Sequence, residues 1–276
     1  TFENNNGNAR FSSMSGAFSS LGGNLSAISI NPASSSVFEL SRLGFSLNGD
    51  RKDVESSFSN TSSSVSSNYF NFQGGIVYVF KNYGEGKFRK FSFGINNQNT
   101  NDYNFDQLIK GKSSFSVDRF FLNNSIGYNV NDVSVGSNET INGVYRWLGQ
   151  NYGYSSQQAF LGFQSYLLDY DNQNNSFYSI AKYNNGLDIN NFYYSQGRKN
   201  KSSINLAAQY GENFYFGINF NIYELYSKKS FRHLENNFDN DSAITLIDFR
   251  NELLTRGKGF SVQLGICLLY TSDAAD

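Results

Sequence analysis

The sequence predicts an all-β fold, namely a transmembrane antiparallel β-barrel preceded by a small non-strand segment. Two observations carry this prediction: a two-residue alternation of apolar and polar side chains, and a composition poor in charge and rich in aromatic residues. Successive side chains of a strand point to opposite faces, so a long alternation describes a sheet with one apolar and one polar face. The wall of a transmembrane β-barrel is built in this way.

The alternation is clearest between positions 214 and 222. One parity holds Phe214, Phe216, Ile218, Phe220 and Ile222, and the other holds Tyr215, Gly217, Asn219 and Asn221. Five further segments repeat the pattern, at residues 43–47, 70–80, 91–95, 204–210 and 260–266. We expect the apolar parity of 214–222 to face lipid and Asn219 and Asn221 to face the interior. A soluble antiparallel sandwich has alternating strands as well and is the alternative fold.

Composition favours the membrane over the sandwich. Charged residues make up 16% of the chain, against about 25% in typical soluble domains. Aromatic residues make up 17%, with 19 Tyr and 27 Phe, which suits the aromatic girdles of a barrel. The mean hydropathy of -0.48 is compatible with a barrel, because only alternate residues face lipid. No run approaches the ~18 consecutive apolar residues of a spanning helix, so we expect strands to cross the membrane.

Charge and cysteine content exclude several other classes of protein. A net charge of -1 supplies no basic footprint for nucleic acid. Cys267 is the single cysteine and His233 the single histidine, so the chain has neither an internal disulfide nor the residues of a zinc cluster. We therefore expect no metal, no cofactor and no nucleic-acid partner.

The first forty residues differ from the rest of the chain. They are rich in small residues and hold the single proline, Pro32. Small residues let short helical turns pack closely, and Gly22 and Gly23 permit a sharp turn between them. Pro32 sets one φ angle and removes one backbone donor. Residues 1–40 are therefore predicted to form a compact non-strand unit.

The motifs of this unit resemble the N-terminal hatch of the FadL/TodX outer-membrane transport proteins, one branch of which is labelled hemin receptor. The matching strings are Ala9-Arg10-Phe11, Met14 to Phe18, Leu21-Gly22-Gly23-Asn24 and Ser29-Ile30-Asn31-Pro32-Ala33. Asn31-Pro32-Ala33 matches the Asn-Pro-Ala motif of the family, and Ser34 stands where most members have Gly. Weaker similarities follow in order along the chain, at residues 165–168, 215–217, 257–260 and 264–265.

The resemblance implies a 14-stranded barrel in the outer membrane of a Gram-negative cell, plugged by residues 1–40. It also implies a monomeric channel, not an enzyme, for passive uptake of hydrophobic small molecules such as long-chain fatty acids or aromatic hydrocarbons. Such a solute would leave sideways through the barrel wall, directly into hydrocarbon. The expected partners are therefore this ligand and the outer-membrane lipid.

The chain is long enough for about half of such a barrel. Residues 41–266 are expected to supply seven or eight strands, with a long extracellular insertion at about 100–190. Residues 267–276 break the alternation and are similar to translated sequencing adapter, so we expect a non-native tail and a truncated barrel.

Two helices are expected within the insertion. Over residues 157–170, Phe160, Phe163, Leu167 and Tyr170 recur at helical spacing and would share one face. A second short helix is expected around residues 142–152, which include Trp147. The resemblance implies that loop helices lie over the barrel mouth and form a capture groove. The four apolar residues are thus candidate ligand contacts, and packing of the loop onto the rim is the alternative.

Hatch residues with predicted roles are Asn31, Pro32, Ala33, Arg10, Gly22 and Gly23. Asn31-Pro32-Ala33 is predicted to form a tight turn against the inner wall, just before a first strand near Arg42. Arg10 is predicted to point into the lumen, where a wall Asp or Glu or a ligand carboxylate could pair with it, because a charge facing lipid is costly.

Three functional classes remain open: a passive transporter, a non-transporting relative that serves secretion-system shuttling or assembly, and a barrel enzyme such as a phospholipase. An enzyme would need a base. His233 is the single histidine, and its run Lys228 to His233 is expected to be a solvated turn. For heme, the candidate axial ligands are His233, Cys267, Met14 and the tyrosines, and we expect no heme cofactor.

Overall fold

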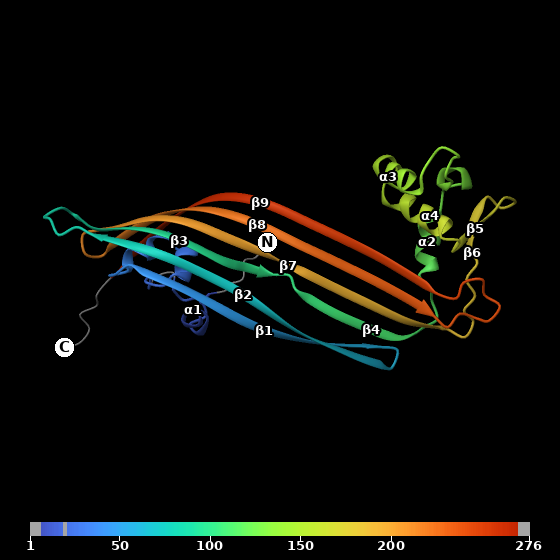
Figure 1. Ribbon diagram of the computed structural model, residues 1–276, viewed down its shortest axis with the longest axis horizontal. Helices are drawn as coiled ribbons and strands as arrows, with labels where there is room; N and C mark the ends of the chain where they lie inside the picture. The colour runs from blue at the N-terminus through green and yellow to red at the C-terminus, as the bar shows by residue number, and fades with distance from the viewer. Residues whose placement is uncertain (1–6, 19–20, 270–276) are drawn as a thin grey trace.

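An open antiparallel sheet of seven strands forms most of the protein (Figure 1). The computed structural model describes residues 7–18 and 21–269. The strands are β1 (Arg42–Phe58), β2 (Thr61–Lys81), β3 (Phe88–Asp102), β4 (Phe105–Ser113), β7 (Leu187–Tyr210), β8 (Phe214–Asn236) and β9 (Ile247–Leu268). Their order is β1-β2-β3-β7-β8-β9, and β4 follows β3 along β7. The predicted all-β antiparallel fold is confirmed. The sheet is not closed, because in the described part of the chain β1 and β9 each pair with one strand.

Local turns explain why most strands pair with their neighbours in sequence. Ser59 and Asn60 connect β1 to β2 with φ angles of 46° and 61°, the left-handed pair that suits a two-residue hairpin loop. Gly211, with φ of 62°, begins the loop between β7 and β8. The three longest strands, β7, β8 and β9, have 24, 23 and 22 residues. At about 3.3 Å per residue they extend over about 75 Å, longer than the span of a bilayer core.

The two faces of the sheet differ in chemistry. One row of paired residues crosses six strands and is apolar throughout: Leu43, Ile76, Ile95, Ile204, Phe220 and Val262. We call this the outer face; Leu43 is 78% exposed on it. On the opposite, inner face, Asn219 and Asn221 are fully buried. The predicted parity of residues 214–222 is thus confirmed as a division between an exposed apolar face and a buried polar one.

The N-terminal segment that the resemblance identifies as a hatch lies on the inner face (Figure 1). It consists of a short helix α1 (Ala9–Ser13) and two 3-10 turns, η1 (Ser26–Ser29) and η2 (Pro32–Val37). The first strand begins at Arg42, as predicted. Gly22 and Gly23 have φ of 61° and 65°, which confirms the sharp turn between them. Below, "hatch" denotes residues 7–18 and 21–38.

An insertion between β4 and β7 packs around its own apolar core, at the end of the strands farthest from the hatch (Figure 1). It contains α2 (Asp118–Ser125), η3 (Val130–Val133), α3 (Ile141–Asn151), α4 (Tyr154–Gln164) and the hairpin β5 (Leu168–Asp171) to β6 (Ser176–Ser179). The helix expected around 142–152 is confirmed as α3. The expected limits of 100–190 were too wide, because β4 pairs with β7 and belongs to the sheet. The insertion comprises residues 114–186.

The helix expected over 157–170 is wrong in its second half. α4 ends at Gln164, and Tyr166 adopts φ of 58°. The amide of Leu167 then donates to the carbonyl of Gly162 (3.1 Å), a left-handed helix stop. The chain turns at once into the β5–β6 hairpin, so Leu167 and Tyr170 lie outside the helix. Three-residue spacing of apolar side chains did not reveal this stop.

The end of the last strand also differs from expectation. β9 continues to Leu268, and Cys267 pairs with Tyr215 of β8. Cys267 is buried against Ala33 and Tyr215. Two residues assigned to the non-native tail therefore belong to the sheet, because the partner strand continues beside them. Residues 270–276 lie outside the described part of the chain.

Candidate functional site

The hatch is held to the sheet by side chains of the inner face that donate to hatch backbone carbonyls. Short 3-10 turns leave carbonyls without partners inside the turn, and buried carbonyls need partners. Four inner-face side chains supply them: Asn219 to Ile28 (2.7 Å), Asn205 to Pro32 (2.9 Å), Lys201 to Ser29 (2.9 Å) and Gln263 to Ile30. The polar parity of the strands thus serves as the binding surface for the hatch.

Asn31, Pro32 and Ala33 form a turn against the wall. The side-chain oxygen of Asn31 accepts from the amide of Ala33 (3.0 Å), while its Nδ2 donates to the carbonyl of Ile266 (3.1 Å). Pro32 is the first residue of η2, where its missing donor costs nothing. The predicted tight turn and its position before the first strand agree with these contacts.

Two glycines of the wall make room for this turn. A Cβ on Gly217 would lie 2.5 Å from the carbonyl oxygen of Pro32, and one on Gly265 would lie 2.2 Å from Oδ1 of Asn31. In the sequence, both residues belong to the polar parity and to weak similarities to the family, and their small size was assigned no role. A glycine inside a strand often marks the close approach of another backbone, and that signal was available at both positions.

Arg10 does not pair with a carboxylate of the wall. Its side chain is exposed, and its guanidinium lies over the ring of Phe18 at 5.5 Å. Asn8 caps α1 by accepting from the amide of Phe11 (2.9 Å), and this orientation turns Phe11 into the hatch interior beside Phe18. Arg10 is left on the other side of the turn, away from the carboxylates of the described strands, and its pairing with a ligand carboxylate stays a prediction.

The wall is interrupted between β2 and β3. These strands pair only from Gly74 with Asn97 to Lys81 with Lys90, although β2 continues with β1 as far as Thr61. β3 instead bulges between Asn99 and Asn101, and the chain continues as β4 along β7. Side chains of the β1–β2 inner face then hold β4 and the turn before it: Lys52 donates to the carbonyl of Asn104 (2.7 Å), and the hydroxyl of Tyr69 donates to the carboxylate of Asp106 (3.0 Å). β4 therefore lies on the inner side of the β1–β2 hairpin.

A hollow of about 580 Å³ lies at this interruption. On the outer side it is bordered by Phe70 and Phe72, which are 72% and 57% exposed. Between the strands, the side-chain amide of Asn99 donates to the side-chain oxygen of Asn71 (2.9 Å) and bridges β2 and β3. The β2–β3 ladder has ended at Gly74 and Asn97, so the Asn71–Asn99 contact is a side-chain hydrogen bond in a part of the wall where these two strands have no ladder.

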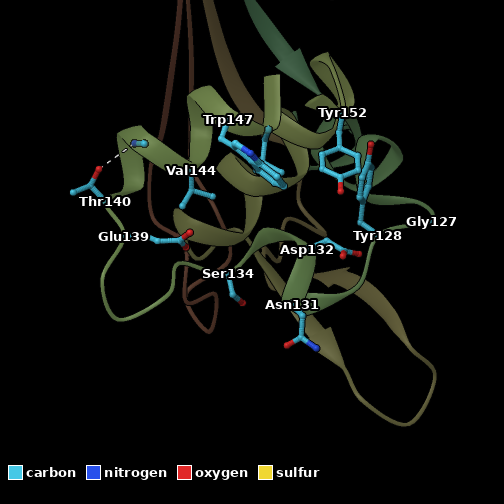
Figure 2. A pocket seen from close by; sticks show the side chains of 12 residues that line it. Gly127, Tyr128, Asn131, Asp132, Ser134, Glu139, Thr140, Val144, Trp147 and Tyr152 are labelled. Carbon is cyan, nitrogen blue, oxygen red and sulfur yellow. Dashed lines mark hydrogen bonds between the residues drawn. The ribbon is translucent and has the colours of Figure 1, made fainter. Parts of the chain in front are cut away.

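A second hollow of about 640 Å³ lies within the insertion (Figure 2). Its lining brings together three aromatic rings and two carboxylates: Tyr128, Trp147, Tyr152, Asp132 and Glu139. Trp147 and Tyr152 meet edge to face, with ring centroids 5.3 Å apart. Of the described residues that line it, none is Lys, Arg or His. The hollow suits a neutral aromatic body better than an anionic head group.

The predicted ligand residues lie elsewhere. Phe160 is fully buried and Leu167 is 4% exposed, both in the core of the insertion. Phe163 and Tyr170 pack against that same core, each edge to face with the ring of Phe177. These contacts match the packing alternative for the four residues. Trp147, noted in the sequence only as a member of a helix, lines the second hollow, because α3 turns it toward Tyr152.

His233 lies in β8, so the expected solvated turn was wrong. β8 continues to Asn236 and pairs His233 with both Asn191 and Phe249. Its Nε2 lies 2.7 Å from the carboxylate of Glu235, which is 1% exposed and also accepts from the amide of Val117 (2.7 Å). Glu235 thereby joins the start of the insertion to β8.

A hydrolase triad would need a different order of contacts from the one around Glu235. The hydroxyl of Ser116 donates to Glu235 rather than to the imidazole of His233. A serine nucleophile requires the imidazole beside its hydroxyl. The arrangement therefore anchors two elements instead of activating a nucleophile.

Comparison with protein-family models, curated proteins and solved structures finds no match for this chain. Within residues 7–18 and 21–269, no group of three or more His, Cys, Asp or Glu side chains is arranged to hold a metal ion. None of the helices in the described part of the chain has the length and apolar character needed to cross a membrane.

Proposed function

We propose that this chain forms the hatch-bearing wall of an outer-membrane channel for passive uptake of hydrophobic small molecules, with lateral release into the bilayer. The observation that carries the proposal is the outer face, on which apolar side chains stand in register across six strands. A sandwich would bury this face against a second sheet. Here Leu43 and Phe45 are 78% and 81% exposed, so hydrocarbon is the environment that satisfies them.

The height of the apolar band fits a membrane. On β8 the outward residues are apolar from Phe214 to Ile222. These nine residues match the about 9–11 residues with which a tilted transmembrane strand crosses the hydrocarbon core. The following outward residue is Glu224, where the band ends.

The route of the solute would begin at the hollow in the insertion and end at the interruption between β2 and β3. Three aromatic rings without a facing cation favour an uncharged aromatic compound over the carboxylate of a fatty acid. At the interruption, Phe70 and Phe72 would pass the solute to hydrocarbon. The transfer needs no covalent step, because the solute gains free energy when its apolar surface leaves water.

One observation favours the alternative, a non-transporting barrel that serves secretion-system shuttling or assembly. The inner face beside the hatch is lined by buried amides, among them Asn96, Asn205 and Asn219. A hydrophobic solute would not follow that polar surface. The two functions therefore differ in whether solute reaches the β2–β3 interruption at all.

Membrane placement is tested by arginine at two depths of β8. Ile218→Arg should destabilise the inserted protein by about 2–4 kcal/mol, and Ile222→Arg, near the edge of the band, by about 0–1 kcal/mol. The measurement is a folding titration of the purified protein in lipid vesicles. Equal costs at the two positions would contradict insertion of this face in lipid.

Lateral release is tested by closing the interruption. In a Cys267→Ser background, Asn71→Cys and Asn99→Cys should react with a short thiol crosslinker, since their side chains are in contact. Crosslinking should abolish uptake of a fluorescent aromatic hydrocarbon by cells that produce the protein. The control pair, Ser57→Cys with Ser62→Cys, joins paired positions of β1 and β2 and should leave uptake intact. Unchanged uptake after the first crosslink would exclude this exit and favour the non-transporting alternative.

A further inference from the structure

The outer face changes from apolar to charged at one level of the sheet. Directly beyond Ile222 and Phe260, the outward side chains on the three strands β7, β8 and β9 are polar or charged. By register they are Asn200, Glu224 and Lys258, followed by Arg198, Tyr226 and Arg256. These six residues border a shallow hollow of about 430 Å³. Three cations and one carboxylate therefore lie at the edge of the apolar band.

This cluster differs from the charges farther along the same strands. Lys228 pairs with Glu252 (3.0 Å), and Arg232 and Arg250 share Asp248 (2.9 and 2.7 Å). At the edge of the band, Glu224 is one carboxylate among Arg198, Arg256 and Lys258. At the edge of the apolar band three cations thus accompany one carboxylate, whereas farther along three cations accompany two carboxylates and each of those cations lies in an ion pair.

The cations also lie at a defined distance from the end of the apolar band. Arg256 lies over the ring of Tyr226 at 5.8 Å, a contact that holds the guanidinium against the sheet. Lys258 is two residues from Phe260, about 7 Å along the strand. Tyrosine at the boundary and long basic side chains beside it are typical of the interface between hydrocarbon and lipid headgroups.

We infer that Arg198, Arg256 and Lys258 form a binding site for the phosphate of a membrane lipid headgroup. Two guanidinium groups can each donate paired hydrogen bonds to phosphate oxygens, and the lysine adds a point charge. Acyl chains of the same lipid would cover the adjacent apolar side chains Ile222 and Phe260. The inference rests on the proposed placement of the outer face in a membrane.

The test compares lipid retention by the purified protein in mixed vesicles of phosphatidylcholine and phosphatidylglycerol. After extraction into mild detergent, the wild-type protein should retain phosphatidylglycerol preferentially. In the triple variant Arg198→Gln, Arg256→Gln, Lys258→Gln, the ratio of retained phosphatidylglycerol to phosphatidylcholine should fall by about tenfold. The control variant Lys228→Gln, Arg232→Gln, Arg250→Gln removes the same charge from the same face and should keep it.

Free phosphate is the other possible source of the anion. Inorganic phosphate, added at constant ionic strength, should leave the lipid preference unchanged. Its displacement of the lipid at millimolar concentration would reassign the site to free phosphate.

Two other results would separate this inference from the proposed function. Insertion into both lipids without a preference, or equal losses in the two triple variants, would overturn the lipid site alone. Failure to insert into any bilayer would overturn the proposed function as well.

Discussion

The hatch and the insertion occupy opposite ends of the same sheet and are stabilised in opposite ways. The insertion has a conventional apolar core, in which Phe160, Leu148 and Val133 are almost fully buried. The hatch has a small core around Phe11 and Phe18 and is held mainly by side-chain donors of the wall. An apolar core gains free energy from buried area, whereas the hatch depends on single hydrogen bonds and on close steric fit. The hatch is therefore the part that can be released without unfolding the rest.

The largest effect should come from the core of the insertion. Phe160→Ala should destabilise it by about 3–5 kcal/mol, because a fully buried ring leaves a cavity. Hydrogen exchange should rise throughout residues 114–186 and stay unchanged in the hatch. The exposed Ile141→Ala, at the start of α3, is the matched control and should have little effect. Simultaneous loss of hatch protection would show that the two ends are coupled.

The next effect should come from the wall glycines. Gly265→Ala places a Cβ where Asn31 and Pro32 now lie, so the hatch should be displaced at a cost of about 1–3 kcal/mol. The measurement is cleavage of residues 1–40 by an added protease. Gly257→Ala is the control on the same strand and face, since its Cβ would be 3.6 Å from the nearest atom. Equal protease sensitivity of the two variants would refute the close-fit argument.

A smaller effect should follow the loss of one donor. Asn219→Ala leaves the carbonyl of Ile28 without its partner and should weaken the hatch by about 1–2 kcal/mol. The same protease assay applies, and the control is Asn200→Ala on the outer face of β7. If Asn219→Ala has no effect on cleavage, water satisfies the carbonyl and the contact contributes nothing.

The smallest effect concerns pH. Hydrogen bonds from Lys90 and Lys81 lower the pKa of Glu39, which ties the chain after the hatch to β2 and β3. Because the pKa is lowered in the folded state, the Glu39 carboxylate stabilises the fold fully above pH 4.5, its ordinary pKa. This stabilisation is lost as the pH falls through the folded-state pKa. Denaturant midpoints of the wild-type protein and Glu39→Gln should differ at pH 7 and converge as the pH falls through the lowered folded-state pKa. A constant difference across this range would contradict the ion pairs.

Local patterns predicted the parts of the fold that depend on neighbouring residues. The parity of residues 214–222 follows from the pleat of a strand, and the helix around Trp147 begins at a local cap, where the side chain of Thr140 accepts from the amide of Gly143. The turn at Asn31 follows from an amide that bonds its own backbone. Each of these depends on a few consecutive side chains, so the sequence was sufficient to predict them.

Three further features depend on residues that only the tertiary structure brings together. Asn71 and Asn99 bridge an interruption that exists because β3 pairs with β7 and leaves β2 early. Gly217 and Gly265 make room for the turn at Asn31 and Pro32, which lies far away from both glycines in the chain. His233 meets Glu235 and the start of the insertion because β8 extends beyond the apolar band.

The sequence by itself thus determined the two-faced strands and the compact N-terminal unit, since alternation and small-residue content are local properties. The tertiary structure alone decided where the wall opens, which glycines must stay small and which side of the hatch Arg10 occupies. The physical reason is that strand register and close contact between distant segments are set by the packing of the whole sheet, and no short window of sequence contains that information.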